Sequence, residues 1–163
     1  MKSTDKFLIG IVAAIVLLIV VALVVTLTLP GLTYQAEDTP EGVAHNYLVA
    51  LQKEEYERAY SYLSPSLDGY PASAEEFAEH VQYDSWRFRL NTDTTLSVES
   101  AKITGSLATV RVRESRFRSG DLFDTGQSTS FFEMELQLED GGWKIVDADY
   151  YFSRCWEREE LCN

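Results

Sequence analysis

The sequence predicts an α+β domain behind an N-terminal transmembrane helix, and three observations lead to this prediction. Residues 7–29 are apolar and uncharged, residues 39–81 carry apolar side chains at helical spacing, and residues 86–152 alternate apolar and polar side chains. Helices followed by antiparallel strands are typical of the α+β class. Because each strand has one polar side, the helices should cover only one face of the sheet. We therefore expect a curved antiparallel sheet wrapped over three helices.

The apolar run from Phe7 to Leu29 contains 23 residues and no charge. At about 1.5 Å of rise per residue, a helix of this length covers roughly 35 Å, enough to cross the hydrocarbon core of a bilayer. A cleaved secretory signal would have a shorter apolar region, about 7–15 residues, and a small-residue cleavage site. A buried core helix would show a polar face. The run is therefore predicted to be an uncleaved membrane span whose partner is the lipid bilayer.

The charges that flank the span predict its orientation. Lys2 and Lys6 precede it, and the first charges after it are those of Glu37, Asp38 and Glu41. Positive residues are retained on the cytoplasmic side of a membrane. We therefore predict a single-pass protein of the cell membrane with its N-terminus in the cytoplasm and its C-terminal domain extracytoplasmic. The corresponding segments are a cytoplasmic end over 1–6, a linker over 30–38, and a domain over 39–152.

The part of the chain after the span is strongly acidic. Residues 1–29 hold Lys2, Lys6 and Asp5, which leaves 12 basic and 25 acidic residues beyond residue 29 and a net charge of −13. Such a surface repels nucleic acid and anionic lipid headgroups, so no nucleic-acid partner is expected. The length of this part suits one domain with a core of its own.

Both cysteines, Cys155 and Cys162, lie in the C-terminal tail over residues 153–163. In an oxidising outer compartment they could close a short loop, although their spacing permits a disulfide without demanding one. No histidine lies near enough in the sequence to complete a zinc ligand set. We expect a disulfide rather than a free pair, and neither a metal nor a cofactor.

The helical region opens with a capping signal. Thr39 is expected as the N-cap, with Pro40 at the first helical position, where its missing N–H is not needed. Ser73 and Glu76 have the spacing of a capping box at the start of a third helix. The apolar stripes of the three helices are Val43, Tyr47, Ala50 and Leu51, then Tyr56, Ala59, Tyr60 and Leu63, then Phe77 and Val81.

From Trp86 onward the apolar period falls to two, and the first expected strand begins there. A change of parity between Val98 and Ala101 predicts a β-bulge. Asp140-Gly141-Gly142 is typical of a tight hairpin. In the last strand we expect one face to carry Val146, Ala148, Tyr150 and Phe152, which leaves Asp147 and Asp149 in solvent. The opposite register would turn both aspartates inward beside Trp143 and Ile145.

Two segments together resemble the nuclear-transport-factor-two-like superfamily. They are "YLVALQKEEYERAYSYLSP" from Tyr47 to Pro65 and "DGGWKIVDADYYF" from Asp140 to Phe152. The resemblance covers residues 39–152 and implies a cone-shaped α+β roll with an apolar mouth and four or five strands. Members often break between their first two helices at a Gly-Asp or Gly-Asn pair. Lys53-Glu54-Glu55 stands there in this chain, so we expect those helices to continue into each other with only a kink.

The superfamily includes enzymes such as ketosteroid isomerases, dehydratases and polyketide cyclases, as well as ligand-binding and protein-contact domains. Enzymes on this roll place Asp, His or Tyr in the cavity for proton transfer. The residues of this chain that could do so are His45, His80, Tyr47, Asp147 and Asp149. A catalytic assignment also needs a positioned partner, which the sequence does not supply, so no catalytic residue is predicted.

Aromatic and arginine residues provide the other candidate sites. Most of the aromatic rings should fill the core, and a surplus could line a ligand cavity. The cavity candidates are Tyr47, Tyr60, Trp86, Phe88 and Trp143. Arginines at two-residue spacing would form a basic stripe on the sheet that docks an acidic partner, unless they pair with Glu99, Glu114, Glu133 and Glu135 across strands. The stripe candidates are Arg87, Arg89, Arg111 and Arg113.

Three functions fit these observations, and the first is our prediction. It is a non-enzymatic, membrane-tethered domain outside the cytoplasm that contacts other proteins, as an accessory subunit of a membrane or envelope complex. The alternatives are binding of a small apolar ligand in the cone, and a cavity enzyme of the isomerase or dehydratase type. An open apolar cavity would favour ligand binding, whereas a filled interior with an exposed apolar patch would favour protein contact.

Overall fold

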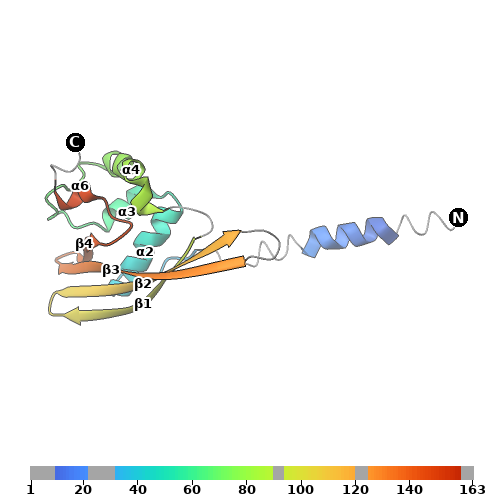
Figure 1. Cartoon of the computed structure of the whole chain (residues 1–163). Helices are drawn as coiled ribbons and strands as arrows, with labels where there is room; N and C mark the ends of the chain where they lie inside the picture. Colours follow the sequence, from blue (N-terminus) through green and yellow to red (C-terminus); the bar gives the residue numbers. More distant parts are fainter. Residues whose placement is uncertain (1–9, 22–31, 90–93, 120–124, 159–163) are drawn as a thin grey trace, which may run out of the picture. The chain divides into compact units, whose positions relative to one another are not determined.

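The computed structural model describes residues 10–21, 32–89, 94–119 and 125–158. The chain divides into two compact units, Met1–Thr33 and Tyr34–Asn163. In the first unit, residues 10–21 form a helix whose side chains are all exposed (Figure 1). None of the helices within the described residues is long and apolar enough to cross a membrane. The predicted span Phe7–Leu29 continues on both sides into residues outside the described ranges.

The second unit begins with two helices separated by a tight break. Helix α2 covers Pro40–Gln52 and α3 covers Tyr56–Ser61. As predicted, the Thr39 hydroxyl caps α2 by accepting the Gly42 N–H at 3.1 Å. The expectation of a continuous, kinked helix is wrong. Glu54 has φ of +58°, and the N–H groups of Glu54 and Glu55 return to the carbonyls of Leu51 and Ala50, which is the hydrogen-bond pattern of a Schellman motif.

Helix α4 covers Ala74–Tyr83 and follows the predicted cap, since the Ser73 hydroxyl accepts the Glu76 N–H at 3.3 Å. The first predicted strand is wrong, because Ser85–Phe88 forms the short helix α5. Local main-chain bonds decide this: Arg87 and Phe88 donate to the Asp84 carbonyl, and Arg89 donates to that of Ser85. A few alternating residues fit a helical turn as well as a strand. A strand would place Trp86 and Phe88 on one face, whereas here Phe88 is buried and Trp86 is exposed.

The sheet is antiparallel, with strand order β1-β2-β3-β4. The strands are β1 Thr94–Thr104, β2 Leu107–Ser119, β3 Thr125–Glu139 and β4 Gly142–Ala148. The predicted bulge in β1 lies between Val98 and Ser100. A second bulge lies in β4, where Val146 is the extra residue between Ile145, which pairs with Leu136, and Asp147, which pairs with Glu135. The predicted hairpin at Asp140-Gly141 joins β3 to β4, and Gly142 adopts φ of +116°, a conformation that favours glycine.

The predicted face of β4 is wrong in its first half. Trp143, Ile145 and Ala148 are buried, whereas Val146 is half-buried. The reason is a bulge in β4 at Val146: Leu136 pairs with Ile145 but the adjacent Glu135 pairs with Asp147, so that the parity of β4 changes between them. Asp147 and Asp149 are nevertheless exposed, as expected.

Helices cover one face of the sheet, as predicted (Figure 1). The inner face of β2 and β3 contributes Ala108, Val110, Val112, Phe132, Met134 and Leu136, each at most 3% exposed. Near the C-terminus, α6 (Arg154–Glu157) places the Trp156 ring in the core, stacked on Phe77 with ring centres 4.9 Å apart. Cys155 of α6 is buried. Cys162 lies outside the described residues, so the disulfide stays a prediction.

The chain just before α2, part of the expected linker, is held on the domain. The buried Asn46 side chain accepts the Gln35 N–H at 2.7 Å and donates to the Gln35 carbonyl at 2.9 Å. The Glu37 carboxylate accepts bonds from Tyr62 at 2.6 Å and Arg58 at 3.1 Å. The main chain therefore follows α2 at close range before the helix begins.

Candidate functional site

A buried carboxylate on β2 is the centre of the most densely connected polar group in the domain. The Glu114 side chain is 1% exposed, and it follows Ala108, Val110 and Val112 on the inner face of the sheet. The Arg89 guanidinium donates to its Oε2 at 3.0 Å. Arg116 donates to Oε1 through Nη2 at 2.9 Å and through Nε at 3.1 Å.

Two hydroxyl groups complete the shell of Glu114. Tyr151 donates to Oε1 at 3.1 Å, and Ser130 donates to Oε2 at 3.2 Å. Burial raises the pKa of Glu114, but the hydrogen bonds from Arg116 and Tyr151 and the charges of Arg116 and Arg89 outweigh burial and hold this pKa below its usual value. Burial, together with the Glu114 charge, raises the pKa of Tyr151.

This arrangement determines what the Glu114 cluster can do chemically. A general base must offer a carboxylate oxygen to the proton that it removes. Both oxygens of Glu114 already accept hydrogen bonds from the protein, and its lowered pKa opposes proton uptake. The cluster is therefore suited to joining α5, the sheet and the chain around Tyr151 rather than to proton transfer.

The sequence carries a signal for this cluster in the alternation of β2. Glu114 continues the parity of Val110 and Val112, so its inward position could have been predicted from alternation alone. The sequence prediction names Glu114 only as one of four acids that could pair with arginines across strands. Its partner Arg89 lies in the wrongly predicted strand, and the left-handed φ of +46° at Arg89 could not be foreseen.

The residues considered for proton transfer contact different parts of the domain. Tyr47 is fully buried and donates to the Tyr151 carbonyl at 2.6 Å. His80 accepts the indole N–H of Trp156 on Nδ1 at 3.0 Å. His45 lines a surface hollow beside β1, with Leu96 and Val98. Asp149 is exposed, as is Asp147, and accepts the main-chain N–H of Glu133 at 3.0 Å.

The five candidates for a ligand cavity fall into three environments. Tyr47 and Phe88 are fully buried, and Trp143 is 8% exposed. Tyr60 is half-buried, and its hydroxyl donates to the Pro71 carbonyl at 2.9 Å. Trp86 is 56% exposed on α5. The structure therefore does not bring the five rings together around one space.

The four arginines of the predicted stripe do not share a sheet face. Arg87 and Arg89 belong to α5 and its end, not to a strand. Arg87 donates to the carbonyls of Phe152 at 2.9 Å and Asp149 at 3.1 Å. On the sheet, Arg113 pairs with Glu99 at 3.0 Å, which is the cross-strand alternative considered from the sequence. The Arg111 guanidinium lies 4.5 Å from the centre of the Phe131 ring.

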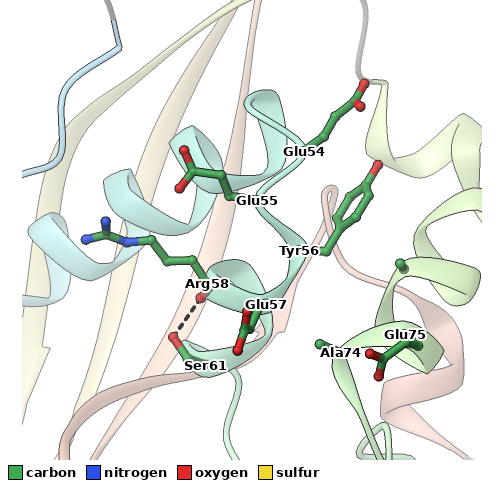
Figure 2. A pocket seen from close by; sticks show the side chains of 9 residues that line it. Glu54, Glu55, Tyr56, Glu57, Arg58, Ser61, Ala74 and Glu75 are labelled. Carbon is green, nitrogen blue, oxygen red and sulfur yellow. Dashed lines mark hydrogen bonds between the residues drawn. The ribbon is translucent and has the colours of Figure 1, made fainter.

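A hollow of about 790 Å³ lies between the break after α2, helix α3 and helix α4. Figure 2 shows its residues on two sides, one from the break and α3, the other from α4. Its polar lining is mostly acidic and consists of Glu54, Glu55, Glu57, Glu75, Arg58 and Ser61, and the remaining residues are Tyr56, Ala74 and Ala78. None of the five aromatic cavity candidates lines it. Its charge would favour a cationic group, and nothing else in the hollow selects a particular ligand.

Comparisons with known proteins give structural likenesses only. No protein-family profile and no curated protein matches the sequence. Among solved structures, a candidate ketosteroid isomerase from Shewanella frigidimarina is 20% identical over 69% of this chain and 95% of its own, with a TM-score of 0.48. A SEC-C motif-containing protein from Rhodopseudomonas palustris is 14% identical over 72% of this chain and 83% of its own, with a TM-score of 0.47.

The structural neighbours also include an NTF2-like protein with a cystatin-like fold from Novosphingobium aromaticivorans. It is 15% identical over 66% of this chain and 75% of its own, with a TM-score of 0.45. The matching solved structures thus include NTF2-like and cystatin-fold proteins. At these identities and TM-scores they assign no activity, ligand or partner to this chain.

Proposed function

We propose that this protein is a non-enzymatic domain, tethered to the cell membrane by its N-terminal helix, that contacts other proteins outside the cytoplasm as an accessory subunit. The observation that carries the proposal is the exposure of the helix over residues 10–21. Its nine Ile, Val and Leu side chains are each 42–69% exposed, and the uncharged sequence extends from Phe7 to Leu29. Insertion of nine such side chains into a bilayer is favoured by on the order of 4 kcal/mol.

The interior of the roll supports protein contact over ligand binding or catalysis. Large side chains fill the space between the helices and the sheet, with Tyr47, Phe88, Tyr151 and Trp156 each at most 1% exposed. The one acid on the inner face of β2 has both oxygens engaged. An interior filled in this way leaves the surface of the domain as the place for partners.

Extraction from membranes tests the tether. The full chain should stay in the membrane pellet after washing with alkaline carbonate, whereas a variant with Ile15→Asp and Leu18→Asp should be released. Each acid placed near the centre of a span costs about 3 kcal/mol, so two acids together cost about 6 kcal/mol, more than the gain of about 4 kcal/mol from the nine apolar side chains. A matched Ile15→Leu and Leu18→Ile variant should remain in the pellet. Release of the unaltered chain by carbonate would contradict the proposal.

Protease added to cells without outer barriers tests the orientation. Digestion of residues 34–163 in intact, unlysed cells is the expected result, because the lysines before the apolar run favour a cytoplasmic N-terminus. Protection of the domain until the cells are lysed would place it in the cytoplasm and contradict the extracytoplasmic assignment.

A further inference from the structure

Two large aromatic side chains near the end of α4 are exposed without an evident structural role. Tyr83, the last residue of α4, is 67% exposed, and Trp86 of α5 is 56% exposed. Among the described residues of Tyr34–Asn163, these are the two most exposed large hydrophobic side chains. Tyr and Trp are enriched at protein interfaces, because their rings bury a large apolar area while a polar group can stay in water.

The main chain below Trp86 is firmly fixed. The Asp84 side chain is buried and accepts the Ser153 hydroxyl at 2.6 Å and the Arg154 N–H at 3.2 Å. The Arg87 carbonyl accepts the Tyr151 N–H at 3.2 Å, and the Arg87 side chain donates to the Phe152 carbonyl. Because α5 is anchored to the chain around residues 149–154 in this way, ordering the Trp86 ring on binding should carry a small entropic penalty.

A cation lies beside the exposed indole. The Arg154 guanidinium is 5.3 Å from the centre of the Trp86 ring. In the part of the chain that the structure describes, no carboxylate pairs with this guanidinium, whereas Arg87 has Glu157 at 3.9 Å. Trp, Tyr and Arg are the residues most enriched where binding energy concentrates in protein interfaces.

From this geometry we propose that Trp86 and Arg154, here called the Trp86 surface, dock an acidic segment of a partner protein; Tyr83 precedes Trp86 by three residues in the chain. An apolar side chain of the partner packs on the Trp86 indole, and a neighbouring carboxylate pairs with Arg154. The inference rests on the proposed function and names the surface and partner chemistry that it requires.

Photo-crosslinking in the native membrane tests the Trp86 surface. A photoreactive phenylalanine analogue replaces Tyr83 in the full chain, and the control carries it in place of Phe131, which is 49% exposed on the sheet. The expected result is a protein adduct from position 83 whose cross-linked peptide is rich in Asp and Glu, with at least five-fold less adduct from position 131. The adduct at position 83 should fall at least five-fold in Trp86→Ala and in Arg154→Glu and persist in Arg154→Lys.

Several outcomes would overturn the inference. They are no adduct at position 83, an adduct only with lipid or with a second copy of this chain, or equal yields in Arg154→Glu and the unaltered background. Trp86 and Arg154 are exposed, so their variants should keep the thermal stability of the domain, which a melting curve checks. If the protein is membrane-bound but gives no adduct, the proposed docking at the Trp86 surface is contradicted and the membrane tether is not. If the protein gives the adduct but is not membrane-bound, the tether is contradicted and the docking surface is not.

Discussion

Two apolar helical segments, α2 and residues 10–21, have very different surroundings. In α2, ten of 13 residues are buried, because β1, β2, β4, α3 and the chain before the helix surround it. Over residues 10–21 every side chain is exposed. Burial of apolar surface is the main favourable term in folding, so an apolar helix needs a cover. The comparison teaches that protein supplies the cover of α2, and it supports lipid as the cover of the other helix.

The largest expected effect comes from placing one acid in each helix. Leu48→Asp should destabilise the domain by roughly 4 kcal/mol or more, since Leu48 is 2% exposed and an unpaired carboxylate would be buried there. Leu18→Asp should leave the melting temperature of the domain unchanged, because Leu18 is 69% exposed. Thermal melts of both variants in detergent make the comparison. A similar loss in both would show that the helix over residues 10–21 has a protein cover.

Among the buried residues of β2 that the structure describes, all but Glu114 are apolar. Replacement of Glu114 should cause the next largest loss of stability. Glu114→Gln should cost roughly 2–3 kcal/mol, less than a fully buried ion pair, because Arg89 and Arg116 are 24% and 39% exposed and can regain water. Denaturant unfolding measures this. The control Glu99→Gln breaks the exposed pair with Arg113 and should cost less than about 1 kcal/mol. Equal losses of stability in the two variants would show that the buried Glu114 ion pairs stabilise the domain no more than the exposed Glu99–Arg113 pair.

The stabilities of the wild type and of Glu114→Gln should depend differently on pH. The folded-state pKa of Glu114 is lowered, so its contribution is complete above the unfolded value, near 4.5, and is lost as the pH falls through the folded value. The stability difference between wild type and Glu114→Gln should therefore be constant near neutral pH and shrink below about pH 4. A difference that grows on acidification would contradict this sign.

A smaller effect is expected where the chain enters α2. Asn46→Ala should cost about 1–2 kcal/mol, because it removes both hydrogen bonds to the main chain of Gln35. Hydrogen exchange at the Gln35 amide should accelerate in parallel. Asn46→Asp keeps the acceptor for that amide and serves as the matched control, with slower exchange than Asn46→Ala. Unchanged exchange in Asn46→Ala would show that the segment is held by other contacts.

The smallest expected effect is a gain in stability at the break after α2. Glu54 occupies the left-handed position of the Schellman motif at φ +58°, where glycine is favoured. Glu54→Gly should stabilise the domain by about 0.5–1 kcal/mol relative to Glu54→Ala, which keeps the unfavourable conformation. Denaturant midpoints of the two variants test this. Membrane association should be unchanged in both, as in every variant of the domain.

Local sequence signals predicted much of the fold, and their failures have a common origin. The caps at Thr39 and Ser73, the bulge after Val98 and the hairpin at Asp140-Gly141 each depend on a few neighbouring residues, and the structure contains them. The prediction of a continuous helix through Lys53-Glu54-Glu55 is wrong, and no glycine in the sequence marks the break that the structure has there. The prediction of a strand beginning at Trp86 is wrong over Trp86–Phe88, because short alternation also fits a helical turn. In β4, the bulge at Val146 changes the parity, and it is defined only by the pairing of β4 with β3.

The amino-acid sequence alone determined most of the order of helices and strands, the uncharged run before residue 30 and the acidic character of the chain. Periodicity and charge are properties of short segments, so both can be read without the tertiary structure. Contacts between distant segments settled the rest. Glu114 joins residues from 89 to 151, and Trp86 is left on the surface because residues 149–154 anchor the turn that bears it. Such partners meet only when the chain has folded, because long-range packing, not local preference, decides which side chains share a space.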